Sequence, residues 1–237
     1  MAIVRLRCQQ AQVTPVKKCE SLTRFAVQED DVFIGDRGFA NRRGVNHVLD
    51  HGGDVVVRMN LGSLPLTDAQ GLPFAQLPHL RTLQVGQTGE WTATMQGTKE
   101  DVAVRVCAYR KTDEQRMESE RKLKKDAQRR QKQLQAETIE AAGYVVVVTT
   151  LDGLDAQGVL ALYRHRWQVE LAFKRLKSLL GLSRLRKKDP EGAQAWLQGK
   201  LLVACLIERL IAVGEHFSPV SHEEHERESG ATPLFVA

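Results

Sequence analysis

Residues 144–150 constrain the fold more than any other stretch of the sequence. They read Tyr-Val-Val-Val-Val-Thr-Thr, an uninterrupted and mostly β-branched run. Such a run favours a strand at the centre of a sheet, where both faces are buried. Residues 31–35 and 54–59 are largely apolar as well and predict two more buried strands. Because helix-favouring segments lie between these runs, the chain is predicted to have a mixed α/β fold.

Several other segments have clear helical or strand patterns. Residues 2–8 alternate as a strand does, and residues 18–27 and 41–49 favour helices, the second ending before Gly52 and Gly53. Residues 113–142 are highly charged and predict one solvated bridging helix, with nucleic-acid contact through its Lys and Arg side chains as the alternative. Residues 193–216 predict a largely buried helix. A basic loop at residues 183–190, which contains Arg184 and Arg186, precedes it.

Residues 61–112 differ in character from the rest of the chain. Prolines and glycines interrupt them, and residues 90–95 and 102–109 alternate as antiparallel strands do. We interpret this stretch as a small β-rich insertion. A plain solvent-facing sheet and a direct contact through Trp91 or Arg105 both remain open.

Composition and missing motifs narrow the function classes. A net charge of +5 and a pI near 9.1 favour a polyanionic partner, although weakly. The sequence has no P-loop, no Gly-x-Gly-x-x-Gly and no His-Glu-x-x-His, so nucleotide-driven and zinc-protease functions have no support. The four cysteines lie far apart and are expected to be reduced and buried. No signal peptide is evident, and residues 201–213 are too short to span a bilayer, so a soluble cytoplasmic protein is expected.

Four polar residues between 163 and 177 share one face of a predicted helix. At about 100° per residue, Tyr163, Arg166, Glu170 and Lys177 fall within a sector of roughly 60°. A carboxylate between two cations and a phenol suits a site that handles a phosphodiester backbone and a metal. An ordinary surface helix with an Arg166–Glu170 ion pair is the alternative, and spacing alone favours it.

A second carboxylate, Asp36, follows the strand predicted at residues 31–35 and precedes a turn at Gly38. Acidic residues at the carboxyl ends of strands often take part in chemistry in α/β sheets. Asp36 and Glu170 can meet only if the strands at 32–36 and 144–150 share a sheet. Such a pair of hard oxygen ligands suits Mg²⁺ or Mn²⁺. Arg166 and Lys177 would then hold the flanking phosphates, and Tyr163 would hydrogen-bond a phosphate oxygen.

The spacing Tyr163-x2-Arg166-x3-Glu170-x6-Lys177 resembles the Tyr-Arg-Glu-Lys signature of bacterial insertion-sequence transposases with a DDE catalytic triad. Asp36-Arg-Gly-Phe resembles the block that carries the second aspartate of that family. The resemblance runs from the first strand to the helix near residue 210. It implies an RNase H-like fold that cuts double-stranded DNA at transposon ends and joins the ends to a target, using two divalent metals, Mg²⁺ or Mn²⁺.

The resemblance also implies roles for single residues. Asp36 and Glu170 would be catalytic metal ligands. Tyr163, Arg166 and Lys177 would bind the transposon-end DNA, with Arg184 and Arg186 of the basic loop as further DNA-binding residues. In related enzymes a tryptophan of the insertion domain assists when the cut end folds into a hairpin, and Trp91 is a candidate for that role.

The domain order follows from the same resemblance. Residues 1–60 would form part of the catalytic core, 61–112 the β-rich insertion, 113–142 the charged bridging helix, and 143–217 the remaining core with the glutamate helix. The polar tail at 218–237 is expected to be disordered. The family further implies a homodimer in the bacterial cytoplasm, associated with the nucleoid and not with a membrane.

One departure from the family is evident before Asp36. The family's first aspartate lies on the opening strand of the fold, whereas Glu20, Glu29, Asp30 and Asp31 lie in helix or turn contexts. We therefore expect an N-terminally truncated RNase H-like core that lacks the first catalytic aspartate, binds metal weakly and performs no strand transfer alone. A non-catalytic DNA-binding remnant or regulator and a decayed pseudogene product are the alternatives.

Overall fold

The computed structural model describes residues 21–179, 181, 189–216 and 234–236. These residues fall into two compact units, each described here by itself. The sheet unit comprises the described residues up to Arg166 together with 234–236, and the helical unit comprises the described residues from Trp167 to 216.

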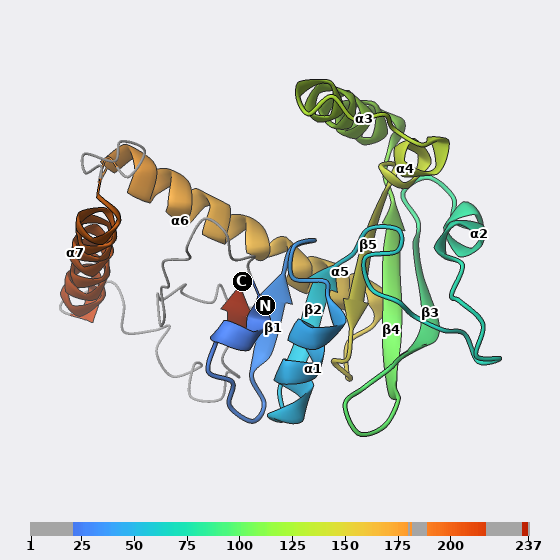
Figure 1. Ribbon diagram of the computed structural model, residues 1–237, viewed down its shortest axis with the longest axis horizontal. Helices are drawn as coiled ribbons and strands as arrows, with labels where there is room; N and C mark the ends of the chain where they lie inside the picture. Colours follow the sequence, from blue (N-terminus) through green and yellow to red (C-terminus); the bar gives the residue numbers. More distant parts are fainter. Residues whose placement is uncertain (1–20, 180, 182–188, 217–233, 237) are drawn as a thin grey trace. The chain divides into compact units, whose positions relative to one another are not determined.

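The sheet unit is built on one six-stranded sheet with the order β3-β4-β5-β2-β1-β6 (Figure 1). β1 is parallel to both β2 and β6, whereas the pairs β2–β5, β5–β4 and β4–β3 are antiparallel. The predicted mixed α/β fold is therefore confirmed. The strands are β1 (Val32–Gly35), β2 (Asp54–Arg58), β3 (Thr88–Met95), β4 (Val102–Arg110), β5 (Tyr144–Thr149) and β6 (Leu234–Val236).

The strands predicted from apolar runs are present. β5 pairs with β2 on one side and β4 on the other, as expected for a strand inside a sheet. β1 and β2 confirm the strands predicted at 31–35 and 54–59, and β3 and β4 confirm the predicted antiparallel pair. β1 and β5 share one sheet with β2 between them, which meets the condition for bringing Asp36 toward the segment after β5.

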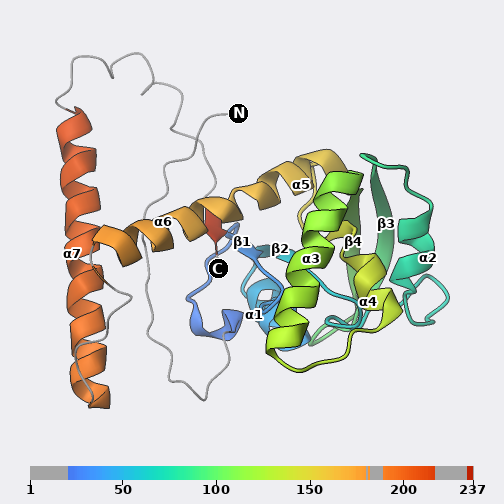
Figure 2. The same ribbon diagram turned by 90° about the horizontal axis from the view of Figure 1, so that it is seen from above.

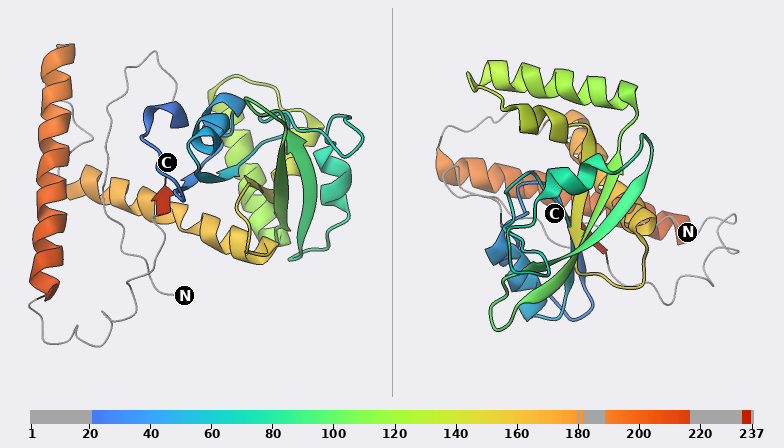
Figure 3. Two further views of the ribbon diagram at one scale, coloured as in Figure 1. Left: turned by 90° about the horizontal axis from the view of Figure 1, so that it is seen from below. Right: turned by 90° about the vertical axis from the view of Figure 1, so that its right-hand side faces the viewer.

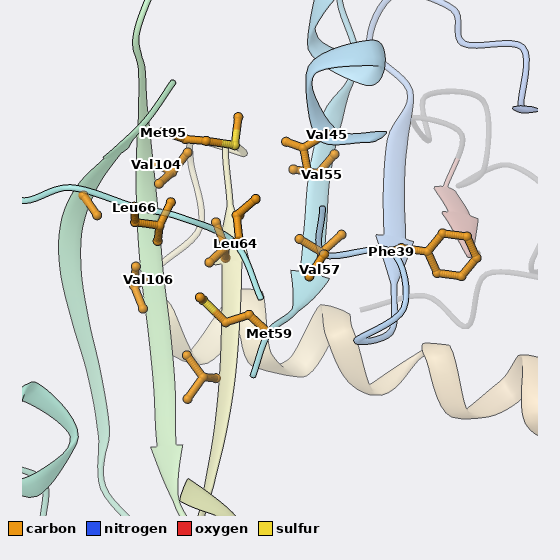
Figure 4. Close-up of a cluster of buried hydrophobic side chains, with 14 of the residues drawn as sticks. Phe39, Val45, Val55, Val57, Met59, Leu64, Leu66, Met95, Val104 and Val106 are labelled. Carbon is orange, nitrogen blue, oxygen red and sulfur yellow. The ribbon is translucent and has the colours of Figure 1, made fainter. Parts of the chain in front are cut away.

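Two apolar layers cover the sheet because successive strand residues face opposite sides. α1 (Arg42–Asp50) and α5 (Ala156–Arg164) lie on opposite faces (Figure 2). Val45 and Val48 of α1 belong to the larger cluster, part of which is drawn in Figure 4. Strand residues on that face include Phe33, Val55, Val57, Val104, Val106, Val146 and Val148. Val159, Leu160 and Tyr163 of α5 pack on the other face, against Ile34, Val56, Cys107 and Val147.

α1 begins and ends where the sequence predicts. The Asn41 side chain accepts a hydrogen bond from the Gly44 N–H at 2.8 Å and caps the first turn. At the other end Gly52 has φ +80°, and the Gly53 N–H donates back to the Val48 carbonyl. The helix predicted at 18–27 is wrong over its described part, where only the 3₁₀ turn η1 (Leu22–Arg24) forms and the backbone is already extended at Phe25.

The charged segment 113–142 is two helices and not the single helix predicted. α3 (Asp113–Arg129) and α4 (Ala136–Ala141) lie together beyond the ends of β4 and β5 (Figures 1 and 3). Gln131 takes φ +53°, and the Lys132 N–H donates to the Ala127 carbonyl at 2.9 Å. This is a left-handed helix stop of the kind that glycine usually forms, which is why the sequence does not reveal it. α2 (Gln76–Arg81) lies beside β3.

The helical unit contains α6 (Arg166–Leu179) from Trp167 onward and α7 (Pro190–His216). α7 confirms the helix predicted at 193–216, but the prediction that it is largely buried is wrong. Ala204 is buried, whereas a broad apolar face on the other side is exposed. The apolar residues of α7 are distributed all around the helix, so when one side is buried the apolar residues on the other sides remain exposed to solvent. The exposed ones are Leu202, Val203, Leu206, Ile207, Leu210 and Val213.

Some predictions fall on parts of the chain outside the described residues. These are the strand at 2–8, the basic loop with Arg184 and Arg186, and most of the tail at 218–237. Within the tail, the expected disorder is wrong for residues 234–236, because Leu-Phe-Val forms β6 and pairs with β1. None of the described helices is long and apolar enough to cross a membrane.

Candidate active site

Asp36 lies in a tight turn directly after β1. Its Oδ1 accepts a hydrogen bond from the Gly38 N–H at 2.8 Å, and its carbonyl accepts one from the Phe39 N–H at 3.2 Å. Phe39 is buried in the main core, which anchors the far side of the turn. The carboxylate is therefore held in a defined orientation while remaining partly exposed.

Arg58 occupies the matching place on the neighbouring strand. Gly35 of β1 is opposite Val57 of β2, so Asp36 and Arg58 follow at the same level of the sheet. Because side chains alternate, both belong to the face that carries Ile34 and Val56, which is the face covered by α5. β4 runs in the same direction as β1 and β2, and the register puts Cys107 level with Arg58. Lys111 therefore follows four residues beyond that level, and it belongs to this edge through the charge interaction of its side chain with Arg58 and Arg37.

Positive charge gathers at this edge. Arg37 is exposed as a whole residue, and the partial desolvation of its guanidinium among neighbouring atoms, followed by the positive charge of Arg58, lowers its pKa. Burial, and after it the charges of Arg58 and Arg37, lower the pKa of Lys111 to about 8. The Lys111 Nζ donates to the Ser119 Oγ at 2.9 Å and to the Ala142 carbonyl at 2.6 Å. Among the described residues, no carboxylate forms a salt bridge with Arg37, Arg58 or Lys111.

Tyr163 and Arg166 belong to the same edge. Tyr163 is 7% exposed and packs among the α5-side core residues, and it lies close to Arg37, the residue after Asp36. The Arg166 guanidinium carbon lies 5.8 Å from the centre of the Tyr163 ring, a cation–π contact. No hydrogen-bond partner reaches the buried Tyr163 hydroxyl within the part of the chain that the structure describes. Such a hydroxyl costs about 1–3 kcal/mol until a partner arrives.

The motif does not lie on one helix, as predicted, but on two. α5 ends at Arg164 and α6 begins at Arg166, and the His165 N–H between them donates to the Leu162 carbonyl at 3.0 Å. Tyr163 is thus in the last turn of α5, while Glu170 and Lys177 lie further along α6 in the helical unit. The turn at His165 is tighter than an α-helical turn, so the motif residues do not keep the angular spacing that one continuous helix would give them. The meeting of Asp36 with Glu170 remains a prediction.

Arg105 and Trp91 have partners within the sheet unit. Arg105 forms a two-point ion pair with Glu90, with Nε–Oε1 at 2.7 Å and Nη2–Oε2 at 2.9 Å, and also donates to the Leu151 carbonyl. Trp91 packs against the main core, with its ring 5.4 Å from that of His79. These contacts favour structural roles over the direct DNA contact that the sequence left open.

The chemistry of the donors bears on a divalent metal. Asp36 offers a fixed, partly exposed carboxylate, a hard oxygen ligand of the type that Mg²⁺ prefers. No group of three or more His, Cys, Asp and Glu side chains that could hold a metal occurs among the described residues. Within the sheet unit, Asp36 fits a metal as one ligand of a set.

Sequence reasoning singled out Asp36, Tyr163 and Arg166 at this edge but missed Arg37, Arg58 and Lys111. Arg37 follows Asp36 directly, so it offered a local signal. Arg58 comes level with Asp36 only through strand pairing, and Lys111 approaches them only because β4 joins the same sheet, so neither offered a local signal.

Comparisons with known proteins agree with the motif. The model of the transposase DDE domain family matches residues 3–206. The putative transposase InsL of insertion sequence element IS186A from Escherichia coli strain K12 is 39% identical over 218 residues, which cover 89% of this chain and 59% of that relative. The transposase of insertion sequence element IS421 from Escherichia coli has the same identity and coverage.

A more distant relative is the transposase of insertion sequence element IS231F from Bacillus thuringiensis subsp. israelensis. It is 29% identical over 129 residues, 54% of this chain and 27% of the relative. The chain spans 59% of the length of the Escherichia coli relatives. These matches confirm the resemblance predicted from the four-residue signature.

Proposed function

Because this chain belongs to the transposase DDE domain family, we propose that it acts in an insertion-sequence transposase that cuts double-stranded DNA at transposon ends and joins them to a target. The observation that carries this proposal is the edge of the sheet after β1. There an oriented carboxylate, a group of cations and a buried phenol hydroxyl come together. The mixed sheet with Asp36 at a strand end supports an RNase H-like core.

Asp36 and Glu170 are the proposed catalytic residues and the ligands of Mg²⁺ or Mn²⁺. A divalent ion bound there would activate water and stabilise the leaving oxygen in phosphodiester cleavage. The Gly38 N–H holds one oxygen of Asp36 and so fixes the direction of the other. Since the motif supplies two carboxylates, we expect weak metal binding and no strand transfer by this chain alone.

The cations and the phenol are the proposed DNA contacts. Arg166 would bind a phosphate with its planar guanidinium while keeping its position over the Tyr163 ring. Tyr163 would donate its hydroxyl to a phosphate oxygen, which removes the cost of leaving that hydroxyl without a partner. Arg37 and Arg58 extend the same positive edge. Lys177, Arg184 and Arg186 complete the proposed set further along the chain.

The larger organisation is part of the proposal. We propose the segments 1–60, 61–112, 113–142, 143–217 and 218–237 as the functional divisions, with β3 and β4 forming an insertion joined to the core sheet. The exposed apolar face of α7 supports a homodimer. The cytoplasm beside the bacterial nucleoid is the proposed location.

DNA binding without cleavage is the second candidate function. The composition of the edge favours it, because Arg37, Arg58, Lys111 and Arg166 outnumber Asp36 there. A chain of this kind would occupy transposon ends and compete with a complete enzyme.

Two measurements on the purified chain separate these functions. Mn²⁺ binding, followed by electron paramagnetic resonance, is expected to show a weak site that Asp36→Asn and Glu170→Gln each abolish. Asp101→Asn, an exposed carboxylate away from this edge, is the matched control and should leave the site intact. Unchanged Mn²⁺ binding in Asp36→Asn would contradict the ligand assignment.

The second measurement follows a labelled duplex that carries an end of the insertion sequence, with Mg²⁺ or Mn²⁺ present. We expect binding that is weakened at least tenfold by Arg166→Ala with Tyr163→Phe. Binding together with metal-dependent nicking that Asp36→Asn abolishes would support a catalytic role. Binding without any nicking would favour the second candidate, and efficient strand transfer would show that two carboxylates suffice.

A further inference from the structure

α3 has two faces of different character. One face lies toward the rest of the sheet unit: Ser119 accepts the hydrogen bond from Lys111, and Ala127 is buried. Leu123, one turn after Ser119 and one turn before Ala127, is half-buried on the same side. This side fixes how the helix is rotated, so the opposite side faces outward.

The acidic residues of α3 are largely taken up by ion pairs within the helix. Glu118 pairs with Lys122 at 2.7 Å, Asp126 pairs with Arg129 at 2.7 Å, and Arg116 lies between Asp113 and Glu120. Glu114 in the first turn is the remaining acidic residue of the helix. Four of the five acidic residues are thus paired, and Glu114 lies two turns before Arg121 on the outward side.

The outward side carries a group of cations that we call the basic face, formed by Arg121, Lys124 and Lys125. At about 100° per residue, this face lies roughly opposite the side that holds Ser119 and Leu123. All three side chains are exposed, and no carboxylate forms a salt bridge with them among the residues that the structure describes. Met117, Glu120 and Gln128 lie beside them on the surface of α3.

We propose that the basic face of α3 binds the phosphate backbone of duplex DNA. This inference rests on the proposed function, since it takes the DNA substrate as given and adds a contact outside the candidate active site. Lysine and arginine side chains that form no salt bridge are suited to neutralising phosphates, with release of condensed counterions. Arg121 and Lys125 are separated along the axis by about 6 Å, comparable to the spacing of adjacent phosphates on one strand.

Two neighbouring residues on the same surface of α3 are compatible with a DNA backbone. Gln128 can donate to a phosphate oxygen without adding charge. Met117 is 65% exposed and offers a flexible apolar contact to deoxyribose. The expected binding is independent of base sequence, because phosphates carry no sequence information directly.

The test measures the salt dependence of binding to a duplex of about 30 base pairs with unrelated sequence, by fluorescence anisotropy. The variant Arg121→Gln/Lys124→Gln/Lys125→Gln removes the basic face. Each lost phosphate contact lowers the slope of log K against log salt by about 0.9, so the slope should fall by about 2 to 3. At 0.1 M salt we expect roughly a hundredfold loss of affinity, which shrinks toward none near 1 M salt.

The matched control is Arg116→Gln/Lys122→Gln/Arg129→Gln, which removes three cations of the same helix that are already ion-paired. Both variants lower the net charge from +5 to +2, since each removes three positive charges. A small effect of the control and a large effect of the basic-face variant support the proposal. Equal losses would show that total charge alone matters and would overturn it.

Two other outcomes separate this inference from the proposed function. If the wild-type chain binds duplex DNA and the basic-face variant binds equally well, this inference fails and the proposed function stands. The basic face would then suit an acidic protein instead. If the wild-type chain binds no duplex DNA, both fail. Circular dichroism of each variant checks that α3 still forms.

Discussion

At the scale of single residues, Gly35 is what allows the Asp36 turn to fold tightly onto β1. A Cβ atom at position 35 would lie 2.9 Å from the Phe39 Cβ and 3.2 Å from the Val57 Cγ1. The strand end, the turn and the neighbouring strand therefore meet at a point where only glycine fits without adjustment. The orientation of Asp36 depends on a residue that carries no chemistry itself.

We expect Gly35→Ala to destabilise the protein by about 1–3 kcal/mol, because Phe39 or β2 must shift to admit the methyl group. Urea unfolding followed by circular dichroism measures the change. Gly199→Ala in α7 is the control, since nothing lies within 4 Å of its added Cβ and helix propensity favours alanine there by roughly 1 kcal/mol. Equal stability of wild type and Gly35→Ala would refute the close approach.

The pair formed by Glu90 and Arg105 gives the sheet a pH-dependent contribution to stability. Hydrogen bonding to Arg105 lowers the pKa of Glu90. Because the folded pKa lies below the unfolded value, the stabilisation is present above the unfolded pKa near 4.3 and is lost as pH falls through the folded pKa. The Glu90 side chain is 37% exposed, so water weakens the pair.

We expect Glu90→Gln to lower the free energy of unfolding by about 0.5–1 kcal/mol at pH 7, with the difference from wild type shrinking below about pH 4. Urea titrations at several pH values measure it. Glu118→Gln removes an exposed pair on α3 and should show a much weaker pH dependence. If the difference in unfolding free energy between wild type and Glu90→Gln stayed constant with pH, the charge of Glu90 would not contribute to its stabilising contact with Arg105.

At the scale of elements, sequence patterns predicted strands better than helix ends. β1, β2 and β5 are runs of apolar, β-branched residues. A strand inside a covered sheet is one of the few structures that bury both faces of such a run. The ends of helices depend on single backbone conformations. The break at His165 and the left-handed Gln131 involve residues with no strong preference for stopping a helix, so the sequence predicted one helix where each time there are two.

Gln131 offers a direct test of the stop after α3. Since its φ of +53° favours glycine, Gln131→Gly should stabilise the protein by about 0.5–1 kcal/mol. Thermal unfolding by calorimetry measures the shift. Gln133→Gly, two residues later and without a positive φ, is the control and should give no gain. If Gln131→Gly destabilised the protein instead, the two helices would have to be continuous in solution.

At the scale of the whole molecule, the sequence predicted the fold class and half of the candidate site. Asp36 and Tyr163 were found because each belongs to a local pattern. The positive edge was missed because Arg58 and Lys111 come from strands that pair across long stretches of sequence. No local pattern records which strand ends lie side by side. The interpretation of residues 61–112 as a separate insertion likewise depends on pairing, since β4 joins the core sheet through β5.

The exposed face of α7 leads to a prediction about assembly. If it forms the proposed homodimer, Leu206→Glu with Leu210→Glu should convert the dimer to a monomer while leaving helix content unchanged. Light scattering coupled to size exclusion measures the mass. Gln198→Glu places charge on an exposed polar position of the same helix and should keep the dimer. A monomeric wild type, or a dimer that survives both leucine substitutions, would contradict the proposal.

The pairing of β6 with β1 has a practical consequence for anyone who works with this protein. The two strands are parallel, with Val236 opposite Ile34, so Val236 is two residues short of the level of Asp36. Two residues of extended chain cover about 7 Å. A bulky probe attached at position 236, for example through Val236→Cys, would therefore lie beside the Asp36 carboxylate. Activity and metal-binding measurements on a chain labelled there would report on the probe as much as on the site.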